Sequence, residues 1–162
     1  MDLMDSMDSA TDYVRIAQSI TIDASRERVF DFVSDFRNDR QWRPEIRRVE
    51  LRGPLVIGTQ LVQDAKVFGF FSLSVSSEVV EFEPGRRLVT RTPADYGAHI
   101  FNVRAVEELS VDVVRFVYEL SFDKAAVKKA LRVALPAGVV STFYGAAVRR
   151  YLGTVKRLVE EA

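Results

Sequence analysis

His99 is the only histidine of the 162-residue chain, and imidazole is the side chain best suited to proton transfer near neutral pH. It lies three residues after Tyr96 and two before Phe101, so a regular strand would turn His99 and Phe101 to one face. Imidazole has an ordinary pKa of about 6.5, so such a side chain can exchange a proton with a phenol or an enol. His99 is therefore the candidate catalytic residue, although a surface or structural histidine fits the same sequence equally well.

Aromatic side chains form the second candidate set, because they fall in the segments that should face each other across a core. A pocket for a small molecule has a volume of about 300–1,000 Å³ and an apolar wall with a few polar groups. Aromatic residues also fill ordinary cores, so each of them has two interpretations. The ligand-binding residues that we predict are Phe70, Tyr96, His99, Phe101, Phe116, Tyr118, Phe143 and Tyr144.

Composition argues against several other chemistries. The chain has no cysteine, which excludes disulfides and thiolate chemistry, suits a reducing cytoplasm and, with a single histidine, leaves too few ligands for a structural zinc site. No glycine-rich phosphate loop, nucleotide fingerprint or Ser-His-Asp arrangement occurs, so we predict no cofactor and no metal. Basic and acidic residues are equal in number, 23 of each, which argues against nucleic acid as a partner.

Arginines in the predicted strands could bind a carboxylate or polarise a ketone if they pointed inward. Residues two apart in a strand share a face. Arg104 has the opposite parity to His99 and Phe101, and Arg115 has the opposite parity to Phe116. We therefore expect both arginines to lie in solvent.

Residues 133–148 form an uncharged stretch of sixteen residues with basic residues on both sides. The stretch is too short to span a bilayer, which takes about 20 residues. Its composition favours a buried helix that closes a pocket. The alternative is a surface that rests on an anionic membrane, since residues 123–162 carry eight basic and only three acidic side chains.

Two hydrophobic periods divide the chain. Alternation predicts a strand over residues 13–23 and about six more between residues 46 and 122, with Pro84-Gly85 suited to a type II turn. A period of 3.6 predicts a short helix after Ser25 and a helix of roughly 25 residues, about 37 Å long, from Pro136 onward. An antiparallel meander and a helix long enough to cross it predict one α+β domain.

Several short motifs occur in an order and spacing that are typical of a known family: the run Ser19-Ile-Thr-Ile-Asp-Ala-Ser-Arg-Glu-Arg-Val-Phe-Asp-Phe-Val-Ser-Asp35, then Asn38, Trp42, Pro44, Gly58 and Glu81-Phe-Glu-Pro-Gly85. Over about residues 14–160 the chain resembles the polyketide cyclase/dehydrase and lipid-transport branch of the START-like (SRPBCC) superfamily. The resemblance implies a helix-grip fold, in which a curved antiparallel sheet of about seven strands wraps around a long C-terminal helix and two short helices follow the first strand. We expect the Trp42 region to pack a loop against the core.

Members of that superfamily bind lipids, sterols, polyketides, plant hormones or aromatic compounds between sheet and helix, and only some of them are enzymes. The resemblance implies binding of a hydrophobic small molecule, polyketide-like, aromatic or lipid, by a domain at residues 13–162. The acidic composition of residues 1–12 predicts a disordered tail before it. The alternatives are a polyketide cyclase, aromatase or dehydratase that uses His99 and a tyrosine, and a ligand-controlled regulatory module. We expect a cytoplasmic monomer or homodimer without a transmembrane segment, with peripheral membrane contact as a further option.

Overall fold

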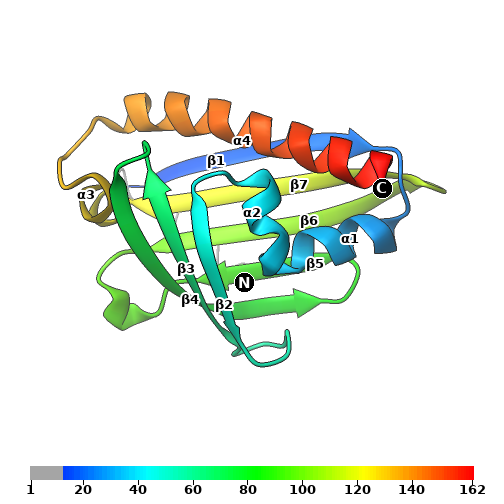
Figure 1. The fold of residues 1–162 in the computed structure, drawn as a ribbon, viewed down its shortest axis with the longest axis horizontal. Helices are drawn as coiled ribbons and strands as arrows, with labels where there is room; N and C mark the ends of the chain where they lie inside the picture. The colour runs from blue at the N-terminus through cyan, green and yellow to red at the C-terminus, as the bar shows by residue number, and fades with distance from the viewer. Residues whose placement is uncertain (1–12) are drawn as a thin grey trace.

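Seven antiparallel strands form one curved sheet in the computed structural model, which describes residues 13–162 (Figure 1). The order across the sheet is β1-β7-β6-β5-β4-β3-β2, so β1 and β2 are its edges. The strands are β1 (Tyr13–Ile22), β2 (Ile46–Arg52), β3 (Gln60–Val67), β4 (Phe71–Glu83), β5 (Arg87–Arg91), β6 (Ile100–Ser110) and β7 (Val113–Asp123). At the predicted turn, the amide of Arg86 donates to the carbonyl of Glu83 at 3.0 Å and Gly85 has φ 76°, as a type II turn requires.

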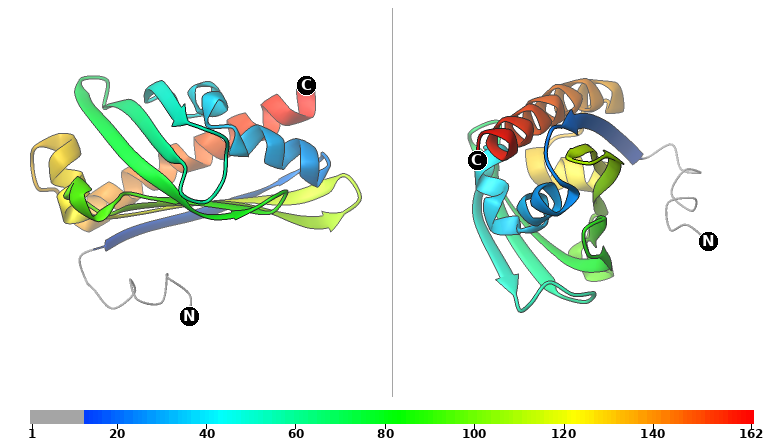
Figure 2. Two further views of the ribbon diagram at one scale, coloured as in Figure 1. Left: turned by 90° about the horizontal axis from the view of Figure 1, so that it is seen from below. Right: turned by 90° about the vertical axis from the view of Figure 1, so that its right-hand side faces the viewer.

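Helices cover the concave face of the sheet (Figures 1 and 2). The helical elements are α1 (Arg26–Ser34), the 3₁₀ turn η1 (Phe36–Asn38), α2 (Asp39–Trp42), a second 3₁₀ turn η2 (Ala94–Tyr96) in the loop between β5 and β6, α3 (Lys124–Leu131) and α4 (Ala137–Glu161). The 25 residues of α4 run beside β1 and along the concave face, and the short helices α1 and α2 follow β1. The predicted α+β helix-grip fold is therefore confirmed.

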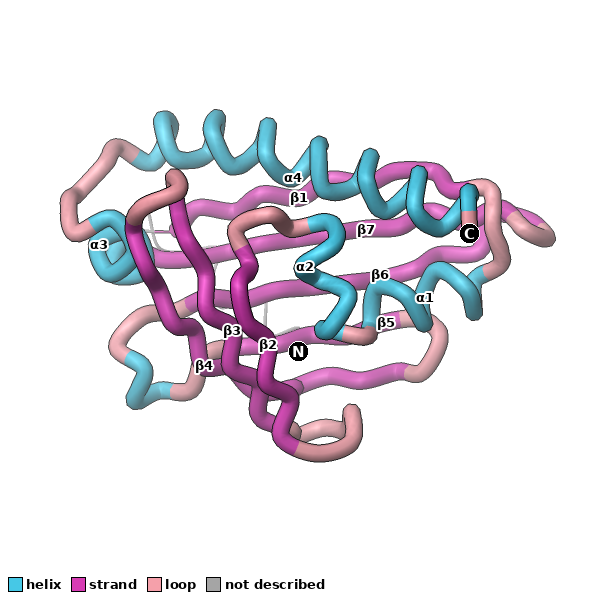
Figure 3. The backbone as a smooth tube through the Cα atoms, viewed as in Figure 1, coloured by secondary structure: helices cyan, strands magenta, loops and turns pink. Residues whose placement is uncertain are grey.

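Two of the helices begin at side-chain caps that the sequence supplies. Ser25 Oγ accepts a hydrogen bond from the amide of Arg28 at 3.3 Å, and Asp123 accepts one from the amide of Ala126 at 2.9 Å. The second cap starts α3, a separate helix that periodicity did not single out. Figure 3 shows α1 and α2 at the end of the sheet under the C-terminal half of α4, and α3 at the opposite end.

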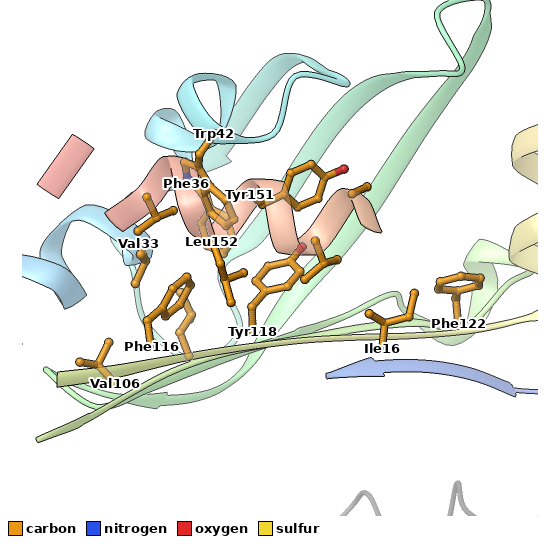
Figure 4. Close-up of a cluster of buried hydrophobic side chains, with 14 of the residues drawn as sticks. Ile16, Val33, Phe36, Trp42, Val106, Phe116, Tyr118, Phe122, Tyr151 and Leu152 are labelled. Atoms are coloured by element: carbon orange, nitrogen blue, oxygen red, sulfur yellow. The ribbon is translucent and has the colours of Figure 1, made fainter. Parts of the chain in front are cut away.

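The core fills the end of the concave face that α1 and α2 cover. Trp42 is 1% exposed, and its ring lies edge-on to Tyr118 at 5.6 Å, Tyr151 at 6.2 Å and Phe116 at 6.3 Å between ring centroids (Figure 4). Leu152 and Val155 of α4 pack into the same cluster. The expected role of Trp42, packing its loop against the core, is what the structure shows.

The strand register corrects one prediction from parity. Across β6 and β7, Arg104 is paired with Tyr118 and Asn102 with Leu120, so the even-numbered residues of β6 face α4. Arg104 is 1% exposed, whereas Phe101 lies on the opposite face of the sheet, packed with Val89 and Val103. The expectation that Arg104 lies in solvent is wrong, because β6 carries apolar side chains on both faces and its periodicity cannot fix the inner one. Arg115 is exposed, as expected.

Within residues 13–162, none of the helices combines the length and the hydropathy that crossing a bilayer demands. The predicted tail at residues 1–12 lies outside the described residues, so the boundary between tail and domain stays a prediction.

Candidate functional site: a cavity between the sheet and α4

A cavity of about 120 Å³ lies between the concave face of the sheet, α3 and α4. The cavity occupies one end of the space between sheet and helix α4, and the side chains packed around Trp42 fill the other end. Most of its wall is apolar and comes from strands β2, β3, β4, β6 and β7 and from both helices: Ile46, Ala65, Val67, Leu73, Val75, Ile100, Leu120, Phe122, Ala126, Val127, Ala130, Leu131, Val140 and Tyr144. The volume is smaller than the 300–1,000 Å³ expected from sequence and is close to that of a cavity able to hold one benzene ring, about 150 Å³.

Polar groups gather where the cavity meets the Trp42 cluster. The polar residues of the wall are Arg43, Glu45, Gln63, Ser77, Thr90, Asn102, Tyr118 and Tyr151. Arg43 and Glu45 owe their position to Pro44, which ends α2 because the residue before a proline avoids the α region. Arg43 accordingly has extended backbone, with φ −117° and ψ 91°. Trp42 holds this segment in the core, so the residues that follow it reach the cavity wall.

Asp39, fully buried at the start of α2, organises the polar end. Its carboxylate accepts two hydrogen bonds from the guanidinium of Arg104, both at 2.7 Å, one from Gln63 at 2.8 Å and one from Arg43 at 3.1 Å. The two-pronged contact with Arg104 matches the planar fork of the guanidinium to the carboxylate. Arg104 also donates to the carbonyl of Val33 at 2.7 Å. These bonds tie α1 and α2 to strands β3 and β6.

Arg43 links this buried pair to the cavity. Besides Asp39, it contacts Glu45, whose Oε1 accepts from Arg43 Nε at 3.2 Å. Burial alone would disfavour the Arg43 cation, but the neighbouring Tyr118, Glu45 and Asp39 raise its pKa well above the ordinary value. The cluster therefore holds two cations, Arg43 and Arg104, against two carboxylates, Asp39 and Glu45.

Two polar atoms of the wall lack a hydrogen-bond partner among the described residues: Glu45 Oε2 and the hydroxyl of Tyr118, both buried. A buried polar atom without a partner costs about 1–3 kcal/mol, so a bound molecule that supplies one gains affinity. Burial raises the pKa of Tyr118, and burial with the nearby Glu45 carboxylate raises the pKa of Tyr151. Both phenols thus stay protonated near neutral pH. Figure 4 shows their hydroxyl oxygens turned to the same side, away from Trp42.

The structure brings two of the predicted site residues into the cavity wall, Tyr118 and Tyr144. Phe116 lies in the core against Trp42, and Phe101 lies on the far face of the sheet. His99 is exposed outside the wall, with its ring 6.4 Å from that of Tyr13. The face that parity assigned to His99 and Phe101 is therefore wrong, for the reason given for Arg104.

The three other predicted residues lie around the end of the molecule that α3 covers. Tyr96 donates its hydroxyl proton to the carbonyl of Ser74 at 2.7 Å. Phe70 is 71% exposed in the turn between β3 and β4, and Phe143 is half-exposed on the outer side of α4. Ligand contact by any residue of the predicted set stays a prediction, and Tyr118 and Tyr144 have the geometry for it.

The sequence patterns did not identify the polar end of the cavity, above all Asp39, Arg43 and Glu45. One signal pointed to it: two charged residues flank Pro44 immediately after a tryptophan expected in the core, so at least one of them had to lie near the interior. Nothing in the sequence paired Asp39 with Arg104, which are 65 residues apart. Among residues 13–162, no three or more histidine, aspartate or glutamate side chains are grouped as a metal site would need.

Comparison with known proteins gives a family and a set of similar structures. The family model described as polyketide cyclase/dehydrase and lipid transport matches residues 13–160. A START superfamily protein from Mycobacterium smegmatis has 19% identity and a TM-score of 0.73, with 91% of this chain and 98% of that chain covered. No curated protein sequence matches the chain.

Two further similar structures have titles that state an activity. The Zhui aromatase/cyclase from a Streptomyces species has 15% identity and a TM-score of 0.69, with 91% of this chain and 94% of that chain covered. The di-domain ARO/CYC BexL from the BE-7585A biosynthetic pathway has 19% identity and a TM-score of 0.68, with 97% of this chain but 53% of that chain covered. At such identities the likeness shows a common fold.

Proposed function

Because the chain belongs to the polyketide cyclase/dehydrase and lipid transport family, we propose that it binds an apolar small molecule bearing a hydroxyl group in the cavity between the sheet and α4. The observation that carries the proposal is the pair of unpartnered buried atoms, Glu45 Oε2 and Tyr118 OH. A hydroxyl group both donates and accepts, so it can donate to the carboxylate of Glu45 and accept from Tyr118. The apolar remainder of the wall suits a ring or a hydrocarbon chain.

Charge balance favours a neutral ligand. The polar end already holds two cations and two carboxylates in contact with one another. A carboxylate ligand would add an uncompensated buried charge, which costs far more than burying a neutral hydroxyl. The size of the cavity fits one small ring, and a longer ligand would displace α3 or the first turns of α4.

Calorimetric titration with a matched pair of probes, 4-methylphenol and toluene, tests the proposal. Both probes place a similar ring in the cavity, and only the first carries the hydroxyl. Tyr118→Phe and Glu45→Gln should each weaken binding of 4-methylphenol by about 0.5–1.5 kcal/mol, the net value of one hydrogen bond, and leave toluene unchanged.

Tyr96→Phe is the matched control, because the Tyr96 hydroxyl is bonded to Ser74 and does not belong to the cavity wall. Absence of binding by both probes would refute the cavity as a ligand site. Equal affinity of 4-methylphenol for the parent and both cavity variants would refute the polar end as the recognition element.

Catalysis on the bound molecule is the second candidate, because the wall contains a carboxylate and phenols and because two similar structures are titled as aromatase/cyclase or ARO/CYC. His99 lies outside the wall, so this version rests on Glu45 and Tyr118. General acid–base catalysis contributes about 10²–10⁴-fold. A loss of that size in conversion of a polyketide-like substrate by Glu45→Gln, with affinity nearly unchanged, would identify an enzyme.

A further inference from the structure

An exposed apolar surface covers the end of the molecule that closes the cavity. It is built from the turn between β3 and β4, the loop between α3 and α4, and the first turns of α4, which all lie at the same end of the molecule in Figures 1 and 2. We call it the apolar tip; its residues are between 38% and 71% exposed, namely Phe68, Phe70, Val133, Leu135, Val139 and Phe143. Contact between the rings of Phe68 and Phe143, 4.5 Å apart, joins the hairpin to the helix.

The turn between β3 and β4 carries aromatic residues where such a hairpin turn usually has asparagine or glycine. Phe68 has φ 53° and Gly69 has φ 80°, so two successive residues have the left-handed conformation of a type I′ turn. That conformation favours asparagine or glycine, and a bulky residue there is strained. Phe70 follows and is the most exposed phenylalanine of the tip. The backbone conformation of the turn therefore does not explain why phenylalanine stands at either position.

Basic residues lie in the same segment of the chain as most of the apolar tip, and this segment contains no acidic residue. From residue 124 to residue 159 the chain has no aspartate or glutamate. Lys128 and Arg132 are exposed at the end of α3, and within residues 13–162 neither of them forms an ion pair. Along α4, Val139 and Phe143 share an outer face with Arg150, since their positions differ by 4 and 7 residues. This face is apolar at the start of α4 and basic about three turns further along.

From this arrangement we infer that the apolar tip docks on an anionic lipid bilayer, with its phenylalanines in the interface and Lys128, Arg132 and Arg150 at the level of the headgroups. A bilayer presents the same order in depth, anionic groups outside and hydrocarbon inside. A second copy of the chain fits poorly, because a two-fold interface would set the same cations against each other. The inner face of the tip's elements lines the cavity, through Val67 and Val140 among others.

Co-sedimentation of the full chain with vesicles tests this inference. Vesicles of phosphatidylcholine mixed with phosphatidylserine should bind the protein, and vesicles of phosphatidylcholine alone should not. Raising the salt to about 1 M shortens the screening length to about 3 Å and should release it. Neither measurement includes the small-molecule ligand. Failure to bind vesicles can therefore be distinguished from failure to bind a ligand in the cavity.

Two pairs of matched variants locate the contact. Phe70→Ser should weaken vesicle binding about tenfold, whereas Val111→Ser, at an 86% exposed valine in the turn between β6 and β7, should leave it unchanged. Lys128→Gln with Arg132→Gln should weaken binding about 25-fold, or about fivefold for each cation. Arg157→Gln, near the other end of α4, should change it less than twofold. Melting curves should be the same for all variants, because each residue is exposed.

Three results would overturn the inference. The first is a failure to bind vesicles that contain phosphatidylserine. The second is an equal loss of binding in the tip variants and in the Val111→Ser and Arg157→Gln controls. The third is a concentration-dependent dimer in analytical ultracentrifugation that Phe70→Ser abolishes, which would make the tip an interface between copies.

Discussion

The two halves of α4 face different interiors. The C-terminal half packs into the core cluster around Trp42, where the ring of Tyr151 lies edge-on to those of Trp42 and Tyr118. The N-terminal half, with Val140 and Tyr144, covers a cavity and turns Phe143 outward. The amphipathic pattern is continuous along the helix, so periodicity alone does not distinguish packing from enclosure. The difference comes from what α2 and α3 place opposite each half.

Removing Asp39 should produce the largest effect on this comparison. Asp39→Ala leaves Arg104 as a buried cation without its carboxylate, which costs about 3–5 kcal/mol of unfolding free energy, measured by urea titration. Glu107→Gln is the control, because the pair of Glu107 and Arg115 is exposed and contributes little. A loss below about 1 kcal/mol for Asp39→Ala would show that the buried pair does not organise this end.

Truncation of matched valines on α4 should distinguish packing from enclosure. Val155 is fully buried in the C-terminal half, and Val140 in the N-terminal half belongs to the cavity wall. Val155→Ala should cost about 2–3 kcal/mol through lost burial and a new void, and Val140→Ala about 1 kcal/mol, because the neighbours of Val140 already border open space. Equal losses in urea unfolding would contradict the contrast between the two halves.

Enlargement of matched alanines should give the same order of stability losses. Ala147→Leu inserts extra carbons at a buried position of α4 outside the cavity wall and should destabilise by about 1–3 kcal/mol. Ala130→Leu adds them to the wall of the cavity, so stability should change by less than about 1 kcal/mol while binding of 4-methylphenol is lost. Retained binding in Ala130→Leu would place the probe elsewhere.

Alkaline pH should give the smallest effect, and it should be confined to the tyrosines of the interior. Burial raises the pKa of Tyr144 to about 12, whereas the unfolded chain titrates near its ordinary value of about 10. Stability from this group is complete below pH about 10 and is lost as pH rises toward about 12, by up to about 2 kcal/mol. Urea unfolding of Tyr144→Phe between these pH values should have a shallower dependence on pH than that of the parent chain.

Sequence patterns could predict the fold because its main elements have long, regular periods. The 25-residue helix, the turn at Pro84-Gly85 and the core position of Trp42 all follow from local rules. The cavity wall could be predicted only in part. In β7 the charged Arg115 marks the outer face, and this places Tyr118 on the inner face. Strand β6 is apolar on both faces, so its pattern does not identify the inner one. The polar end of the cavity could not be predicted from the sequence, because Asp39 and Arg104 are 65 residues apart and are brought together only by the tertiary fold.

The ends of α4 are held unequally, and this has a dynamic consequence. At its C-terminal end, Lys156 donates to the carbonyl of Thr21 at 2.9 Å, Glu160 accepts from the amide of Asp23 at 2.8 Å, and Arg28 donates to the carbonyl of Ala162. At its start, Pro136 provides no side-chain cap. We therefore expect α4 to move away from the sheet at its N-terminal end, near Ala137, while its C-terminal end stays in place.

Amide hydrogens near Phe143 should then exchange with solvent by local opening, and those near Val155 only when the whole domain unfolds. A ligand could enter by lifting the first turns of α4 without disturbing the Trp42 cluster. The rate of entry would then depend on the free end of the helix, while the lifetime of the folded chain would depend on the anchored one.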